Sequence, residues 1–165
     1  MPSPQAQGGI STLVRLPHDA SSARTARRWA VDAVSAAGVA PEVVDDVALV
    51  VSELVTNAVR HAAALPGGTI EVCVVTGVPN AAVQLRVTDG GGPTLPTLPS
   101  MPPASRPSGG PLGAATVPLS GGRGLSIVSS VVDHWGVDVD PSGSTTVWAE
   151  LRSRQARNGV ADRPA

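Results

Sequence analysis

The sequence has no lysine, no phenylalanine and no tyrosine, and it has one cysteine in 165 residues. Without lysine the chain can form neither a Schiff base nor a P-loop, whose phosphate-binding motif needs a Lys. Its only cysteine, Cys73, excludes an internal disulfide and a multi-cysteine zinc site. No stretch approaches about 18 consecutive apolar residues and no signal-peptide pattern is present. We therefore expect a soluble, cytoplasmic protein without a membrane segment.

The residues that are present indicate one globular domain with an aliphatic core. Hydrophobic residues make up 42% of the chain, but three tryptophans are the only members of the Phe, Trp and Tyr class. Valine-rich runs must therefore supply much of the packing, which favours strands. The net charge is −1, and every basic residue is Arg. This balance gives no general attraction to nucleic acid or to an anionic membrane.

Apolar periodicity predicts two long helices, five strands and a further short helix. The helices are expected at residues 20–37, 39–63 and 125–133, and the strands at 12–16, 69–75, 82–88, 135–140 and 145–152. This order predicts an α/β two-layer sandwich, with helices on one face of a mixed, mostly antiparallel sheet. We expect a domain over 12–152, with disordered termini at 1–11 and 153–165.

A segment rich in Pro, Gly and Ser interrupts the pattern over residues 89–124. A loop of this length is usually functional or disordered, and an interdomain linker is the other interpretation. Only about 40 residues follow it, too few for an independent domain without metal or disulfides. We therefore interpret it as an excursion within one domain.

The stretch ELVTNAVRHA places four polar residues on one face of the second helix, namely Glu53, Asn57, Arg60 and His61. On spacing alone, a solvent-facing side of the helix is the simpler interpretation. Asn57 fits that interpretation least well, because Asn is a weak helix former.

Two glycine-rich motifs flank the long loop. In LRVTDGGG, Asp89 ends a strand, where its carboxylate could accept a hydrogen bond from a ligand or merely mark a turn. In SGGRGLS, glycines precede a helix, where free N–H groups suit phosphate, although glycines there are common. The loop between the motifs, residues 93–120, is where a lid over a ligand would lie.

Three arginines gather on the first predicted helix, namely Arg24, Arg27 and Arg28. They form either a solvated basic face or a surface that binds a partner protein.

The combination of these motifs resembles a known superfamily. Glu-x-x-x-Asn on a helix, Asp-x-Gly after a strand, a variable loop, and Gly-x-Gly-Leu opening a helix are similar to the ATP-binding domains of gyrase, histidine kinases and anti-sigma factor serine kinases, the Bergerat fold. Within it, ELVTNAVRHA and TTVWAEL are most similar to the stand-alone anti-sigma factor kinases of actinobacteria. The resemblance covers about residues 12–152.

The resemblance implies a site for ATP and Mg²⁺. Asn57 matches the magnesium ligand, Glu53 the candidate general base and Asp89 the acceptor for the adenine amino group. Gly91 matches a glycine packed near the base, and Thr146 matches a threonine that supports the adenine pocket. His61 matches a position that either packs or contacts phosphate. The positions that match the phosphate-binding motif are Gly122, Arg123, Gly124 and Leu125.

The resemblance also implies a serine/threonine kinase that phosphorylates an anti-sigma factor antagonist, with a sigma factor as a competing partner and a homodimer as a further expectation. Two departures, Pro93 in the first glycine motif and a lid whose only charged residue is Arg106, bear on catalysis more than on binding. The alternatives are a nucleotide-dependent binding module without catalysis and an interaction protein with an inactive pocket. His18 is the only upstream histidine and lies outside a helical hairpin, so autophosphorylation is not expected.

Overall fold

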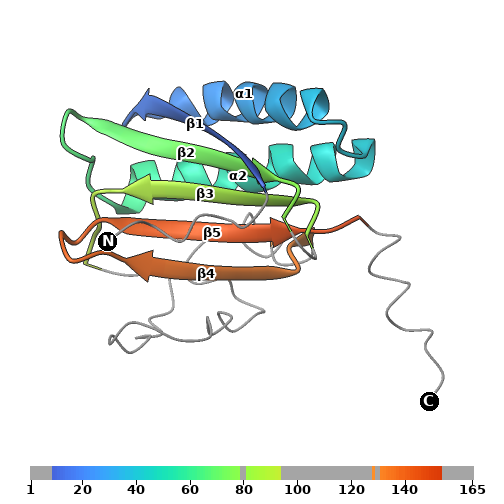
Figure 1. Ribbon diagram of the computed structural model, residues 1–165. Helices are drawn as coiled ribbons and strands as arrows, with labels where there is room; N and C mark the ends of the chain where they lie inside the picture. Colours follow the sequence, from blue (N-terminus) through green and yellow to red (C-terminus); the bar gives the residue numbers. More distant parts are fainter. Residues whose placement is uncertain (1–8, 79–80, 94–127, 129–130, 154–165) are drawn as a thin grey trace, which may run out of the picture.

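A computed structural model describes residues 9–78, 81–93, 128 and 131–153, which form a five-stranded sheet and two long helices. In chain order the elements are β1 (Ile10–Pro17), α1 (Ser22–Ala36), α2 (Pro41–His61), β2 (Thr69–Thr76), β3 (Val83–Asp89), β4 (His134–Val139) and β5 (Thr145–Leu151). Both helices lie behind the sheet, on one of its faces (Figure 1). This arrangement confirms the predicted two-layer α/β sandwich.

The strands lie in the order β1-β2-β3-β5-β4. Every neighbouring pair of these strands is antiparallel, so the described part of the sheet is antiparallel throughout rather than mixed. β5 lies between β3 and β4. The chain therefore leaves the sheet after β3 and returns as the edge strand β4. It then forms β5, which pairs with both β3 and β4.

Alternation along the strands separates two faces, here called the helix-side face and the outer face. On the helix-side face, Val72 of β2 pairs with Val87 of β3, and both are buried in the core together with Ile70 of β2. Trp135 of β4 is also buried there. Trp29 of α1 packs against the same core, which is otherwise largely aliphatic and rich in valine.

The two helices have local sequence features that explain their bounds. Ala26, Ala30 and Val34 recur every four residues along α1 and are all buried, so this helix packs through a narrow stripe of small side chains. Gly38 follows α1 with φ +73°, a conformation that glycine adopts without steric cost. Pro41 opens α2, where its fixed φ is suitable and its missing N–H loses no helical bond.

Element boundaries agree closely with the predicted ranges, apart from the first strand. β1 begins at Ile10 rather than at residue 12, and the expected N-terminal segment is shortened accordingly. Of the predicted helix 125–133, Val128 and Val131 are helical, and Val132 N–H donates to the Val128 carbonyl (3.1 Å). The expected lid lies outside the described residues from 94 onward, as do the termini 1–8 and 154–165. Within the described part, no helix is both long and apolar enough to cross a membrane.

Candidate functional site

The polar stripe of α2 divides into two halves. Glu53 and Asn57, one turn apart, are half-buried, whereas Arg60 and His61 are exposed at the end of the helix. The interpretation of the stripe as a plain solvent-facing side therefore fits only its second half. Arg60 also lies in the last turn of the helix, where a cation is favoured by the helix dipole.

Asn57 has an unsatisfied side-chain amide. Its Nδ2 is buried and has no hydrogen-bond partner among the described residues. Leaving a buried polar group unpaired costs about 1–3 kcal/mol, so such groups in native proteins need an explanation. A 180° rotation about χ2 exchanges the amide nitrogen and oxygen. The unpaired end is therefore suited either to donate to a phosphate or to place Oδ1 on a metal.

Asp89 ends β3 on the helix-side face, where it is buried. Gly91 N–H donates to its Oδ1 (2.8 Å), the only hydrogen bond to this carboxylate from a described residue. Burial raises the pKa of Asp89, and the Gly91 hydrogen bond and the charge of His18 oppose that shift. A carboxylate held in an apolar setting with spare acceptor capacity is suited to bind an N–H donor of a ligand.

Main-chain hydrogen bonds join the glycines after β3 to the end of α2. Ala63 N–H donates to the Gly91 carbonyl (2.7 Å), and Gly90 N–H donates to the Ala63 carbonyl (2.8 Å). A Cβ on Gly90 would overlap the Ala64 carbonyl, and one on Gly92 would lie 2.7 Å from the His61 carbonyl oxygen. The loop that begins at Asp89 and the helix that carries Asn57 are therefore fixed at the same edge of the sandwich.

Gly91 is required by both conformation and space. Its φ is +82°, and a Cβ there would overlap the carbonyl oxygen of Gly143 in the turn between β4 and β5. Three segments therefore converge on this glycine: the end of β3, the end of α2, and the turn before β5.

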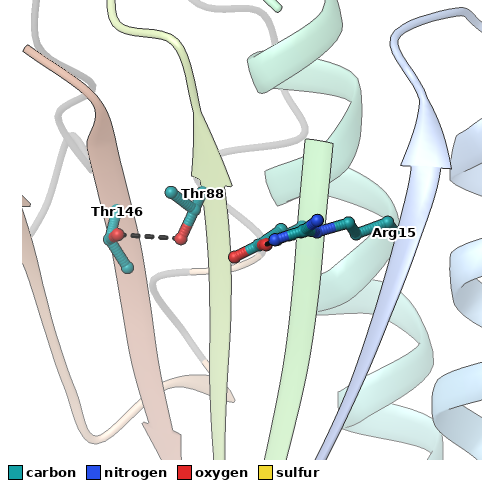
Figure 2. A network of polar contacts seen from close by, with 4 residues as sticks. Arg15, Thr88 and Thr146 are labelled. Carbon is teal, nitrogen blue, oxygen red and sulfur yellow. Dashed lines mark hydrogen bonds and ion pairs between the residues drawn. The ribbon is translucent and has the colours of Figure 1, made fainter. Parts of the chain in front are cut away.

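The structure places Thr146 on the opposite face of the sheet from Asp89. Thr146 lies on the outer face of β5, where its hydroxyl is hydrogen-bonded to that of Thr88 (2.8 Å; Figure 2). Its neighbour Thr145 pairs with Asp89 across β3 and β5, is buried, and has its Oγ1 3.6 Å from a Cβ built on Gly91. Side chains two residues apart in a strand point to the same face, so the apolar Val147 could have predicted that Thr145, and not Thr146, faces the helices.

The predicted phosphate motif lies outside the described residues, and so do its members Gly122, Arg123, Gly124 and Leu125. Pro93 is exposed and is the last described residue before that gap. On α1, Arg24, Arg27 and Arg28 are exposed and form no ion pair with a described residue.

A comparison with protein families matches residues 16–150 to the histidine kinase-like ATPase domain. The chain belongs to this family. Among solved structures, the RsbU and RsbW domains of Rv1364c from Mycobacterium tuberculosis share its fold, with a TM-score of 0.58 and 19% sequence identity over 87% of the present chain. The present chain spans only 32% of that longer one. The comparison with curated proteins found no match.

Membership of the histidine kinase-like ATPase family implies that the chain binds ATP. The edge where Asn57 and Asp89 keep unused hydrogen-bonding capacity is the part of the described structure suited to that ligand.

Proposed function

We propose that this edge binds Mg-ATP and that the protein transfers the terminal phosphoryl group to a serine or threonine of an anti-sigma factor antagonist. The observation that carries the proposal is the half-buried pair Glu53 and Asn57, with the Asn57 amide unpaired among the described residues. The similarity of ELVTNAVRHA and TTVWAEL to anti-sigma factor kinases supports the partner class, with a sigma factor as the competing partner.

Asp89 and its glycines fit the adenine end of ATP. The Gly91 N–H occupies one acceptor position on Oδ1, which leaves Oδ2 for the adenine amino group. The absent side chain at Gly91 lets a flat base approach the main chain. Thr145, buried beside Asp89, is the threonine that would support this pocket.

Asn57 fits the magnesium end. Mg²⁺ is usually held by one or two protein oxygens and completes its shell with phosphate oxygens and water. No three His, Cys, Asp or Glu side chains gather into a metal site among the described residues, so the ion would depend on ATP itself for most of its ligands. Once bound, magnesium would neutralise phosphate charge, and Asn57 would fix its position relative to the helix.

Glu53 lies one turn before Asn57 and is the group we assign to proton acceptance. In the proposed transfer, the partner hydroxyl oxygen forms a bond to the γ-phosphorus, the bond to the β,γ-bridging oxygen breaks, and ADP leaves. The hydroxyl proton passes to the Glu53 carboxylate.

Nucleotide binding is tested by thermal unfolding of the purified protein with and without Mg-ATP. A ligand that binds only the folded state stabilises it by about 2.7 kcal/mol at a concentration of 100 times Kd. We expect Mg-ATP to raise Tm, and Asn57→Ala to lose the part of the shift that depends on magnesium. No shift at millimolar Mg-ATP would contradict the ATP site.

Phosphoryl transfer is tested with the partner that the protein captures in the presence of Mg-ATP. Mass spectrometry should find phosphoserine or phosphothreonine on that partner, and Glu53→Gln should keep ATP binding but stop the modification. Continued modification by Glu53→Gln would exclude Glu53 as the base. Capture without any modification by the wild-type protein would instead support the nucleotide-dependent binding module.

A further inference from the structure

His18 connects the end of β1 to α2, across 40 residues of sequence. Its Nε2 lies 3.1 Å from the main-chain carbonyl oxygen of Ala58, and the interaction is partly buried. Ala58 directly follows Asn57 in the last part of α2. No motif assigned to ATP includes this histidine, so the contact is a separate feature of the fold.

The partner atom determines the direction of this hydrogen bond. A carbonyl oxygen can only accept, so Nε2 must carry the proton and donate it. The same Ala58 carbonyl also accepts the helical N–H of Ala62 (3.1 Å). His18 therefore adds a second donor to a carbonyl that is already satisfied, and loss of the ring would leave no buried carbonyl unpaired.

Local hydrogen bonds hold the main chain at His18 in place. The His18 N–H donates to the Gly68 carbonyl (2.9 Å), which ties it to the start of β2. Pro17 precedes it with a fixed φ, and the Ser22 hydroxyl donates to the Pro17 carbonyl (2.6 Å). Because the main chain at Pro17 and His18 is fixed in this way, the ring can position another element without a large entropic cost.

The end of α2 is thus held from two directions. From one side, the glycine loop binds Ala63 through two main-chain hydrogen bonds, and that loop carries Asp89. From the other side, His18 binds Ala58, next to Asn57. His18 also lies close enough to Asp89 for its charge to lower the pKa of that carboxyl, although burial has the larger, opposite effect.

We propose that His18 is a positioning residue of the nucleotide site: its Nε2–H fixes the turn of α2 that carries Asn57 relative to the loop that carries Asp89. The two ends of one ATP molecule would contact these two elements, so their spacing must match the nucleotide. This inference rests on the proposed Mg-ATP site and adds a residue that does not itself touch the ligand.

The test compares ATP binding with Mg²⁺ and with EDTA, by isothermal titration calorimetry, in four proteins: wild type, His18→Ala, His18→Gln and His134→Ala. We expect His18→Ala to reduce the magnesium-dependent gain in affinity by roughly three- to tenfold, the range for loss of one hydrogen bond. Its affinity in EDTA should change less than about twofold, because the base end remains intact. His18→Gln should restore the gain, since its amide N–H can reach the Ala58 carbonyl.

His134→Ala is the matched control, because His134 is exposed on β4 and absent from the site. It should bind ATP as the wild type does under both conditions. If His18→Ala does not fold, as judged by circular dichroism, His18→Asn replaces it, because the shorter amide keeps a polar group but does not reach Ala58.

Three results would overturn the proposal: an equal loss of affinity in magnesium and EDTA, no loss in either, or no rescue by His18→Gln. A wild-type protein that binds ATP equally with and without magnesium would instead contradict the role of Asn57. A wild-type protein that binds no ATP would contradict the proposed function itself, and with it the role of His18.

Discussion

The two faces of the five-stranded sheet differ in how their polar side chains are paired. On the outer face, Arg15 pairs with Glu71 and Thr88 with Thr146 (Figure 2), and Gln84 Nε2 donates to Glu150 Oε1 (2.9 Å). On the helix side, the amide of Asn57 is unpaired among the described residues, and Asp89 takes one hydrogen bond there.

We interpret the paired groups of the outer face as serving the fold, and the helix-side groups as available to the proposed ligand. Pairs on the outer face are complete without a further molecule, and Gln84 is buried there. Groups on the helix side sit at an edge where the core ends and where hydrogen-bonding capacity remains unused. Burial with unused capacity is therefore a better guide to this site than polarity alone.

Gly91→Ala should have the largest effect. Alanine is strained at the positive φ of this residue, and its Cβ would overlap the Gly143 carbonyl oxygen. We expect the free energy of unfolding to fall by at least about 2 kcal/mol and ATP binding to be lost. Gly143→Ala is the matched control, since Gly143 has φ +90° but no atom within 4 Å of an added Cβ. Urea unfolding of both variants measures the difference, and equal losses would exclude the overlap as a cause.

Asp89→Asn should weaken ATP binding by roughly tenfold or more. If the amide oxygen keeps the hydrogen bond from Gly91, the amide nitrogen replaces Oδ2 and cannot accept a hydrogen bond from the adenine amino group. The same variant should be more stable than the wild type at neutral pH. Burial raises the Asp89 pKa, so the ionised carboxylate is costly in the folded state.

The pH dependence of that stability difference has a definite sign. Below the ordinary value of 3.8, Asp89 is protonated in both states, so its ionisation should contribute nothing to the stability difference between the two proteins. The advantage of Asp89→Asn should develop as the pH rises from 3.8 to the raised pKa and stay constant above it. Unfolding free energies from pH 3 to 8 check this, and an advantage that is independent of pH would show that ionisation is not its cause.

Thr145→Val and Thr146→Val compare the faces directly, with the same substitution at adjacent positions. Thr145→Val should weaken ATP binding by roughly threefold to tenfold, whereas Thr146→Val should leave binding unchanged. Thr146→Val should instead cost about 1 kcal/mol of stability, because it removes the hydrogen bond to Thr88. If ATP affinity fell in Thr146→Val but not in Thr145→Val, the result would support the adenine role that the sequence resemblance implied for Thr146.

Arg15→Ala should have the smallest effect. Arg15 and Glu71 form an ion pair, but the Arg15 side chain is 70% exposed, so solvent and salt screen the attraction. We expect a loss below about 1 kcal/mol that shrinks as salt rises, with ATP affinity unchanged. A loss that is the same in low and high salt would indicate packing of the Arg15 stem rather than charge.

Much of this fold could be predicted from the sequence because its periodicities are regular. The alternation of valines predicted the strands, and the apolar periodicity of residues 20–37 and 39–63 predicted the two long helices. The placing of Asp89 at a strand end was also correct. Thr145 could have been identified from the alternation that places Val147 on the helix side, but the family resemblance directed attention to Thr146.

Other features could not be read from the sequence, because they depend on distances between segments far apart in it. The contact between His18 and Ala58 requires the chain after β1 to reach α2, 40 residues away in the sequence. The need for glycine at position 90 arises from the Ala64 carbonyl, and nothing in the local sequence indicates that neighbour.

The sequence by itself determined which residues lie on each helix face and each strand face, because those periodicities follow from local backbone geometry. It thereby determined that Glu53 and Asn57 share a face and that Thr145 and Thr146 do not. Only the tertiary structure decided which of these faces is buried, which polar groups find partners, and which remain unpaired. Burial and pairing depend on what packs across from a residue, so Asn57 differs from Arg60 only once α2 has docked beside the loop of Asp89.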